Sequence, residues 1–367
     1  MTPYFISPEV PSDAISPEAV IHPGCRLYGK DLSIGPGCVL GEEGPVTVRD
    51  CQLGRNVHLA GGFYDQATLL DGVVGGDQAH VRPACLFEED VTFGHCCGFK
   101  QTLLMPFVTA GSLANFCDVL MAGGTSRKNH SEVGSSYVHF NFTPYRDKAT
   151  ASLIGDVPQG VLLDQPPIFL GGQGGVVGPR SVAFGSLIPA GQVCRRDITR
   201  PCHLVVGKPS CEAELPYPPP YRVNVLKVFN ANLLYIGNLL AFDHWYRHIR
   251  QPFMMADVWH ARCHRGALQR FAESFEERVK RLDQFVGFLA EEKAEGQPAE
   301  SAEVIRNWPR VREKIENRVA SRMALPQPPL FVSPSNGGFI AAVQALGSED
   351  KAVLQKHLQG IVELVRK

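Results

Sequence analysis

The first two hundred residues repeat an apolar position every six residues, which is neither a helical period nor an ordinary strand period. An aliphatic or aromatic residue opens each unit, a small or polar residue often follows, and the fifth place is usually small or β-branched. Such units include ISPEAV (15–20), IGPGCV (34–39), VRPACL (81–86) and FGHCCG (93–98). A period of six is typical of a hexapeptide β-helix, in which each unit forms one flat side of a triangular coil and its first residue points inward. We therefore predict an all-β, left-handed parallel β-helix over residues 1–210.

Four cysteines occupy the fifth place of their units, namely Cys25, Cys38, Cys85 and Cys97. A buried thiol behaves as a small hydrophobe, so we expect these four to pack inside the coil rather than react. The chain has eleven cysteines, an odd number, and no two CxxC pairs at the spacing of a zinc site. Reduced thiols and a cytoplasmic location are therefore expected.

Three segments interrupt the hexapeptide pattern, at 41–50, 61–72 and 139–153. Insertions in such repeats map to loops on one face and often carry the binding function. The third insertion lies within 131–156, where it separates two strand-like runs and is rich in groups that bind ligands or move protons. We interpret this stretch as a site loop rather than a plain corner.

The period changes in the last third of the chain. Proline-rich CEAELPYPPPY (211–221) has the stiff, extended character of a linker. Beyond it apolar residues recur at helical spacing, first at Leu226, Phe229, Leu233, Ile236 and Leu240, and again at Phe271, Phe275, Val279, Leu282 and Leu289. We predict an α-helical region over 222–367, in which the histidine and aromatic residues of 244–248 pack against a neighbouring element or subunit. Trp259, His260 and His264 form a second such group.

Charge and hydropathy exclude two classes of partner. The formal net charge is −1 at pH 7, so no global field points to nucleic acid or to a membrane surface. The N-terminus lacks a basic segment followed by an apolar run, so no signal peptide is expected. No stretch reaches ~18 uninterrupted apolar residues, the longest candidate lying around 233–242. We expect neither a nucleic-acid nor a membrane partner.

Four segments then resemble a known family in their order along the chain. They are SEVGSSYV (131–138), SLIGD (152–156), IFLGGQGGVVGP (168–179) and LIPAGQVCRRD (187–197). Together they resemble the acetyltransferase domain of the bacterial bifunctional UDP-N-acetylglucosamine pyrophosphorylase/glucosamine-1-phosphate acetyltransferase. The resemblance is close over 131–198 and loose over the rest of the β-helix.

This resemblance implies a homotrimer of left-handed β-helices, with acetyl-CoA as co-substrate in the groove between subunits. By the same resemblance Gly172 and Ala190 line the path of the CoA chain, and the polar turn 139–148 faces a sugar phosphate. The fold hosts many functions, so the resemblance is more specific for the fold than for the substrate. The nucleotidyltransferase half of the family is absent from this sequence, so a pyrophosphorylase reaction is not expected.

The sequence departs from the family at the catalytic base. The family uses the histidine of a His-Leu-Thr-Tyr motif, and Gly124 stands at that position here. The nearest histidines are His130 and His139. Because neutral imidazole has a pKa near working pH, we predict one of these two as the base. The family's Asn-Tyr-Asp-Gly turn is also replaced, by Thr-Pro-Tyr-Arg-Asp at 143–147.

Polar and basic side chains cluster around the interruption of the hexapeptide pattern at 139–153. Arginine offers a planar fork to a phosphate and lysine a point charge. We predict that six residues bind a sugar phosphate or sugar nucleotide, the alternative being an exposed loop of mixed charge: Arg127, Lys128, Asn141, Tyr145, Arg146 and Lys148.

The leading function is therefore acetyl transfer from acetyl-CoA to an amine or hydroxyl of a sugar phosphate or sugar nucleotide. A second hypothesis is a non-catalytic trimeric β-helix that binds a sugar nucleotide or presents its helices to a partner. A third is a zinc hydratase like the γ-class carbonic anhydrases, using His58, His80 and His95. These histidines lack the close spacing of that family, so no metal site is predicted.

Overall fold

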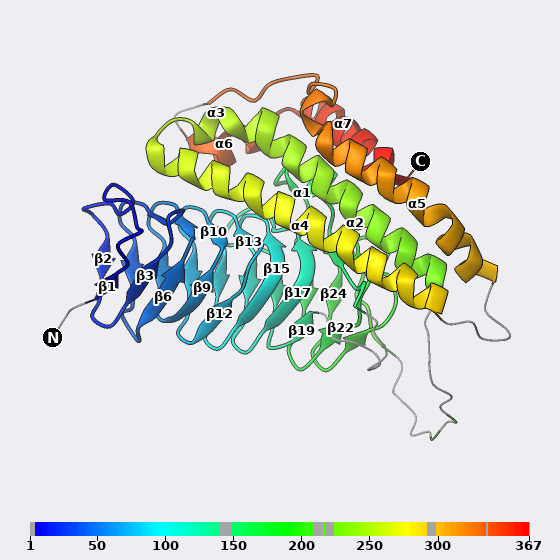
Figure 1. Ribbon diagram of the computed structural model, residues 1–367, viewed down its shortest axis with the longest axis horizontal. Helices are drawn as coiled ribbons and strands as arrows, with labels where there is room; N and C mark the ends of the chain where they lie inside the picture. Colours follow the sequence, from blue (N-terminus) through cyan, green and yellow to red (C-terminus); the bar gives the residue numbers. More distant parts are fainter. Residues whose placement is uncertain are drawn as a thin grey trace.

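The computed structural model describes residues 4–138, 148–207, 214, 216, 224–291, 299–334 and 337–366. Its strands pair in parallel and wind into a solenoid of about ten turns. Figure 1 shows the solenoid along the long axis of the molecule, with the helices of the last third lying along one side. The predicted parallel β-helix followed by an α-helical region is confirmed.

Each full turn places one short strand on each of three faces, numbered here in chain order. Face 1 holds β1 (Phe5–Ile6), β3 (Arg26–Tyr28), β6 (Val46–Arg49), β9 (Gly62–Asp65), β12 (Ala79–Val81), β19 (Tyr137–Val138), β22 (Gly175–Val176) and β25 (Val193–Cys194). Face 2 holds β4 (Ser33–Ile34), β7 (Gln52–Leu53), β10 (Ala67–Leu69), β13 (Cys85–Phe87), β20 (Ser152–Ile154) and β23 (Ser181–Val182). Face 3 holds β2 (Val20–Ile21), β5 (Val39–Leu40), β8 (His58–Leu59), β11 (Val74–Gly75), β14 (Thr92–Phe93), β16 (Thr109–Ala110), β18 (Glu132–Val133), β21 (Phe169–Leu170) and β24 (Leu187–Ile188).

Two longer strands, β15 (Gly98–Leu104) and β17 (Asn115–Met121), bend from face 1 into face 2. The three edges of the solenoid are named corner 1–2, corner 2–3 and corner 3–1 after the faces that they join. Corner 3–1 lies opposite face 2.

The interior of the solenoid is a stack of inward-facing apolar residues. At its centre the rings of Phe87, Phe93, Phe99 and Phe116 lie with centroids 5.0–5.6 Å apart, at separations typical of favourable aromatic pairs. Gly75 occupies the inward position next to Phe93, where an added Cβ would lie 2.6 Å from that ring. The aromatic stack therefore requires a glycine on the neighbouring turn.

The fifth-place cysteines are part of this interior. Cys25, Cys38, Cys85 and Cys97 are all buried. Burial raises the pKa of the Cys38 and Cys85 thiols to about 12, so both stay protonated at neutral pH. Their predicted role in packing is confirmed.

Tight corners explain an error in the sequence interpretation. At corner 1–2 of five successive turns a non-glycine residue takes a positive φ of 46–63°, namely Asp50, Gln66, Ala84, Gln101 and Asp118. Without a glycine to mark them, these corners look irregular in the sequence. The segments 41–50 and 61–72, predicted to interrupt the repeat, instead hold β6, β9 and β10 in register with their neighbours. That prediction is wrong.

The insertions that do leave the coil come later. Residues 122–131 leave it at corner 2–3, between β17 and β18, and residues 155–168 leave it at the same corner with α1 (Val157–Gly160). The segment between β19 and β20 joins face 1 to face 2 at corner 1–2, and its residues 139–147 lie outside the described residues.

The last third forms a helical layer over face 2 (Figure 1). It consists of α2 (Val225–Trp245), the π-helical turn η1 (Tyr246–Arg250), α3 (Gln251–Met254), α4 (Val258–Glu291), α5 (Ala299–Ala320), the 3₁₀ turn η2 (Arg322–Ala324), α6 (Gly338–Gln344) and α7 (Ser348–Arg366). The helical periodicity predicted for α2 and α4 is confirmed. The predicted linker 211–221 falls in a stretch of which only residues 214 and 216 are described, so the domain boundaries stay predictions.

The outward positions of face 2 explain why helices cover it. Leu86, Leu103, Leu120 and Leu153 stand outward on successive turns, and each is at most 3% exposed. Burying such side chains contributes about 1.5–3 kcal/mol each. In the N-terminal half of α4, Gly266 lies so close to Gln52 and Thr68 that an added Cβ would clash with both side chains. The helices thus rest directly on the sheet.

A buried ionic cluster also joins the two layers. Arg250 of η1 is 1% exposed and donates to Glu88 Oε1 at 2.7 Å and to the Glu89 carboxylate. The Tyr246 hydroxyl donates to the same Glu88 oxygen at 2.6 Å, and the Phe339 ring centroid lies 4.0 Å from the guanidinium carbon. Burial raises the pKa of Glu88 to about 7, an effect that Arg250 opposes. These buried charges are tolerated because each is paired.

The histidine and aromatic residues of this region pack as predicted. His244, Trp245 and Tyr246 are buried, and the His260 ring nitrogen lies 2.8 Å from Asp71 Oδ2. The helical run Val225–Met254 is long and apolar enough to cross a membrane, although 67% of its most apolar window is buried within the protein. Polar residues such as Lys227 and Asp243 interrupt the run, and its burial is that of a core helix, so the absence of a membrane partner stays a prediction.

Candidate functional site

Corner 3–1 brings together the two residues predicted to line the CoA path. Gly172 and Ala190 stand on successive turns, and the Gly191 amide donates to the Gly172 carbonyl at 2.8 Å. An added Cβ on Gly171 would lie 2.2 Å from the Ala190 nitrogen, and one on Gly134 would lie 2.6 Å from the Gly172 nitrogen. Glycine therefore keeps the turns close here, while Ala190 itself is exposed. The result is a bare edge along which an extended chain can lie near the backbone.

A groove continues this edge toward the N-terminus. It has a volume of about 380 Å³, and its lining includes His80, Arg82, Asn115 and Tyr137. Tyr137 pairs with Gly175 on the next turn, so the groove begins one turn away from Gly172. The Arg82 guanidinium contacts the Cys117 sulfur at 3.7 Å and supplies a positive charge beside the groove. The positive charge of Arg82 beside the polar lining of the groove suits a negatively charged ligand that carries a polar ring.

Arg82, Asn115 and Tyr137 are not among the site residues predicted from the sequence. Arg82 does carry a signal, because it occupies the second place of VRPACL, where a small residue is usual. A long cationic side chain at that place must leave the coil and reach solvent. Tyr137 carries a similar signal, because it occupies the fifth place of VGSSYV, where a small or β-branched residue is usual, and in the structure it is 55% exposed.

Arg127 lies in the first insertion at corner 2–3, and its guanidinium binds its own chain. It donates to the carbonyls of Asp90 at 3.0 Å and Phe107 at 2.8 Å, and to the hydroxyls of Thr92 and Thr109 at 3.1 Å each. These bonds fix the insertion to the two preceding turns. The substrate-binding role predicted for Arg127 stays a prediction.

His130 stands beside this anchor. Its Nδ1 lies 2.9 Å from the Arg127 carbonyl, which makes Nδ1 the donor and leaves Nε2 with the lone pair in neutral imidazole. Nε2 lies 3.7 Å from Glu132 Oε2, and Lys128 is exposed at the end of the same turn. This tautomer is the one that a general base at Nε2 requires.

The structure also gives a reason for Gly124. An added Cβ on this buried residue would lie 2.0 Å from the Asn129 carbonyl oxygen. No histidine fits at the family's base position without rebuilding the insertion.

Four of the remaining predicted residues, His139, Asn141, Tyr145 and Arg146, lie outside the described residues. Lys148 is exposed where the chain returns to corner 1–2. Of the described residues, the predicted site thus occupies three different corners: Gly172 and Ala190 at corner 3–1, Arg127, Lys128 and His130 at corner 2–3, and Lys148 at corner 1–2. One chain does not bring them together.

The three histidines of the zinc hypothesis are also apart. His58 Nε2 lies 2.8 Å from Glu42, His80 packs edge-on against Phe63, and His95 Nδ1 lies 2.8 Å from Ser112 Oγ. Within the described ranges, no group of three or more His, Cys, Asp or Glu residues is arranged to hold a metal ion.

Comparison with known proteins agrees with the motif-based resemblance. No family model matches the chain. It is 28% identical over 185 residues to the bifunctional protein GlmU of Pelobacter propionicus and 29% identical over 182 residues to that of Trichlorobacter lovleyi. It is 48% identical over 62 residues to the bifunctional protein GlmU of Syntrophotalea carbinolica.

These matches cover only part of each protein. The first two span 50% and 49% of this chain, and 36% and 35% of the relatives. The predicted resemblance is confirmed to that extent. With its parallel β-solenoid, the chain is similar to bifunctional GlmU proteins over about half of its own length and about a third of theirs.

Proposed function

We propose that this chain is an acetyl-CoA-dependent acyltransferase that acetylates an amine or hydroxyl of a sugar phosphate or sugar nucleotide. The observation that carries the proposal is corner 3–1, where the bare edge at Gly172 and Ala190 leads into the groove beside Arg82. An extended pantetheine chain needs a narrow, uncrowded path, and the phosphates of CoA or of the acceptor need a cation. The similarity to bifunctional GlmU proteins supports this reading.

The site is completed between copies of the chain, as a homotrimer. Of the described residues, the predicted base His130 and the predicted cations Arg127, Lys128 and Lys148 stand at other corners than the CoA path, so a neighbouring copy would supply them. The helical layer occupies face 2, which leaves corner 3–1 on the far side for this contact. Face 3 supports the assembly, because Phe169, Leu187 and Leu204 stack in register on it and are 38–63% exposed.

The chemistry needs one base. The acceptor nitrogen or oxygen attacks the thioester carbonyl carbon, the new C–N or C–O bond forms and the C–S bond breaks. A neutral histidine takes the proton of the acceptor, and that proton leaves with the CoA thiol. His130 is the described candidate, since its Nδ1 is held by a backbone carbonyl and Nε2 keeps its lone pair. The ten described cysteines are all free, which fits a reducing cytoplasm.

Acetyl-CoA binding measured by calorimetry tests the proposal, together with mass spectrometry of products from a panel of amino-sugar phosphates. We expect binding and the gain of one acetyl group on one acceptor. Replacing exposed Ala190 by Trp blocks the edge and should weaken binding at least tenfold. The exposed Ala256→Trp is the matched control. No binding at ~1 mM acetyl-CoA, about −4 kcal/mol, contradicts the transferase.

The base is tested separately. His130→Asn should remove turnover while acetyl-CoA binding persists. His203 is the matched control, because its Nδ1 also lies close to a backbone carbonyl, that of Pro201 at 2.6 Å. Turnover that survives in His130→Asn assigns the base to another residue, with His139 next in order.

A non-catalytic binder is the second candidate, favoured by the clash that excludes a histidine from position 124. It predicts a protein that binds a sugar nucleotide such as UDP-N-acetylglucosamine and yields no acetylated product with any acceptor.

A further inference from the structure

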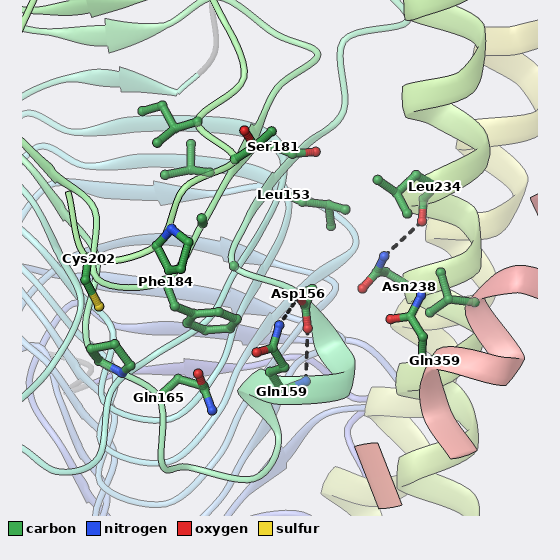
Figure 2. Close-up of a pocket in the computed structure, with 18 residues that line it drawn as sticks. Leu153, Asp156, Gln159, Gln165, Ser181, Phe184, Cys202, Leu234, Asn238 and Gln359 are labelled. Atoms are coloured by element: carbon green, nitrogen blue, oxygen red, sulfur yellow. Dashed lines mark hydrogen bonds between the residues drawn. The ribbon is translucent and has the colours of Figure 1, made fainter. Parts of the chain in front are cut away.

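A second cavity lies between the solenoid and the helical layer, away from corner 3–1. It has a volume of about 570 Å³, within the range of small-molecule sites. Its lining comes from the insertion 155–168, from the last turns of the solenoid at corner 2–3, and from α2 and α7. Figure 2 shows these elements facing one another across the cavity. No residue predicted from the sequence for the transferase site lines it.

The walls are apolar and held in place. Leu153, Phe184, Leu234 and Val362 contribute hydrocarbon or aromatic surface. Gly155 has a φ of +78°, and an added Cβ there would lie 2.9 Å from the Phe184 ring. The floor is therefore close-packed and requires a glycine, which is consistent with a preformed cavity.

A hydrogen bond ties the helical wall to the solenoid wall. Asn238 of α2 is buried, and its Oδ1 accepts from the Val157 amide at 2.9 Å. Its Nδ2 donates to the Leu234 carbonyl at 3.0 Å (Figure 2). A buried amide with both groups paired fixes the distance between the two layers.

The polar groups around the cavity are amides and hydroxyls. Figure 2 places Gln159, Gln165, Ser181 and Gln359 around it, together with the carboxylate of Asp156. Asp156 accepts from the Gln159 amide nitrogen at 2.9 Å and from Gln159 Nε2 at 2.7 Å. Burial raises the pKa of Asp156, an effect that the two bonds from Gln159 oppose.

Charge decides which ligands the cavity accepts. Among the described residues that line it, none is Lys, Arg or His, and Asp156 is the one acidic residue. A phosphate or carboxylate would lose its water without gaining a cation, and would lie near a carboxyl group. Phosphorylated sugars, nucleotides and CoA are thereby disfavoured. A flat or cyclic molecule with carbonyl and hydroxyl groups satisfies both the apolar walls and the amides.

We propose that this cavity binds an uncharged, ring-containing small molecule with amide or hydroxyl groups, such as a nucleoside or an unphosphorylated sugar, at a site separate from the acyltransferase corner. The ligand touches the last turns of the solenoid, α2 and α7 at once. The proposal does not depend on the transferase, since the two sites occupy different corners and share no lining residue among those described.

Calorimetry and ligand-observed NMR on the full chain test it, with uridine, adenosine and N-acetylglucosamine as uncharged probes. Uridine 5′-monophosphate, adenosine 5′-monophosphate and N-acetylglucosamine 1-phosphate are their charged counterparts. We expect saturable binding of at least one uncharged probe with a Kd below ~1 mM, and at least tenfold weaker binding of its phosphate. Absence of binding by all three uncharged probes, or equal binding of the phosphate, overturns the proposal.

Two filling variants locate the binding. Ala183→Trp and Thr199→Trp, both in the lining, should weaken binding of the probe at least tenfold. Ala256→Trp, on the exposed connection between α3 and α4, is the matched control and should leave it unchanged. Thr199 is exposed, so its variant is expected to fold even where Ala183→Trp does not. Unchanged affinity in a folded Thr199→Trp protein places the probe elsewhere and contradicts the assignment.

A charge variant tests the exclusion of anions. Asp156→Asn keeps a side chain that caps α1 but removes the carboxylate. Binding of the uncharged probe should stay within twofold, while binding of its phosphate strengthens. A phosphate that gains nothing in this variant contradicts the role given to Asp156.

Discussion

Face 1 and face 2 are built from the same repeat, but their outward positions differ. On face 2 four successive turns place leucine outward, at positions 86, 103, 120 and 153, and the helical layer buries all four. On face 1 the corresponding turns place His80, Asn115 and Tyr137 outward, where they line an open groove. The inward positions fix the solenoid on both faces. The outward positions decide whether a face holds another layer of the protein or is left for a ligand.

The largest expected effect lies in the ionic cluster under the helical layer. Arg250→Ala leaves Glu88 and Glu89 without their buried cation and should lower the free energy of unfolding by about 3–5 kcal/mol. Urea denaturation followed by circular dichroism measures it.

The double variant Arg250→Met with Glu88→Gln is the control, since it removes the charge of both partners. We expect it to recover part of the loss. If Arg250→Ala lowers the free energy of unfolding by less than about 1 kcal/mol, the cluster is hydrated rather than buried.

The same substitution on the covered face 2 and on the uncovered face 3 extends the comparison. Leu103→Ala on face 2 should cost about 2–5 kcal/mol, because it opens a cavity under the helices. Leu187→Ala on face 3, where the side chain is 45% exposed, should cost less than about 0.5 kcal/mol in the monomer. Thermal and urea unfolding measure the loss of unfolding free energy in each variant. Equal losses in Leu103→Ala and Leu187→Ala would contradict the assignment of face 2 as the covered face.

Arg82→Gln tests the groove on face 1. Loss of a charged hydrogen bond to a phosphate should weaken binding of a phosphate-bearing ligand by about 1.5–3 kcal/mol, with little change in stability. Calorimetry with acetyl-CoA and with a sugar phosphate measures it. Arg26 also lies outward on face 1, outside the groove, and Arg26→Gln is the control. An unchanged affinity for both ligands would remove Arg82 from the site.

The smallest expected effect is a pH dependence at the N-terminal end of the helical layer. The hydrogen bond that the His260 ring donates to Asp71 raises the pKa of His260, and the charge of Asp257 adds to this. Because the folded pKa lies above the unfolded one, this stabilisation is fully present below about pH 6.5 and is lost as the pH rises through the folded pKa. His260 is partly solvated, so the contribution is less than about 1 kcal/mol.

His260→Gln should remove this dependence. Unfolding free energies at pH 6 and pH 9 measure it in both proteins. If the unfolding free energy changes between pH 6 and pH 9 by the same amount in the variant as in the unchanged protein, the effect belongs to another group.

Much of the fold was predictable because inward positions repeat along the sequence. The hexapeptide units, the fifth-place cysteines and the helical spacing of Phe271 and Leu282 all describe one-dimensional patterns that packing then preserves. The errors arose where the backbone took a positive φ without glycine, as at Asp50 and Gln66, since no residue type marks such a corner.

The candidate site was less predictable, because hydrogen bonds between distant turns leave no pattern in sequence. The sequence suggests that Arg127 is a cation available to a ligand, but in the structure its guanidinium donates to four acceptors on two earlier turns. The sequence suggests that Arg82 is an ordinary member of a hexapeptide unit, but in the structure it lines a groove. Residue type alone did not separate these two arginines, although the place of Arg82 within its unit was a usable signal.

The 34-residue helix α4, which lies over face 2, has a consequence for how the solenoid unfolds. In a solenoid without other elements, each turn contacts only the neighbouring turns, so the solenoid can unfold gradually from either end. Here α4 binds Asp13 through Arg262, Asp71 through His260 and Asp118 through Arg278, which are positions on turns far apart along the axis. Opening one terminal turn therefore also breaks contacts of a helix that spans many turns. Amide hydrogen exchange across the turns under α4 should consequently report a single cooperative opening rather than a gradient of protection from the ends.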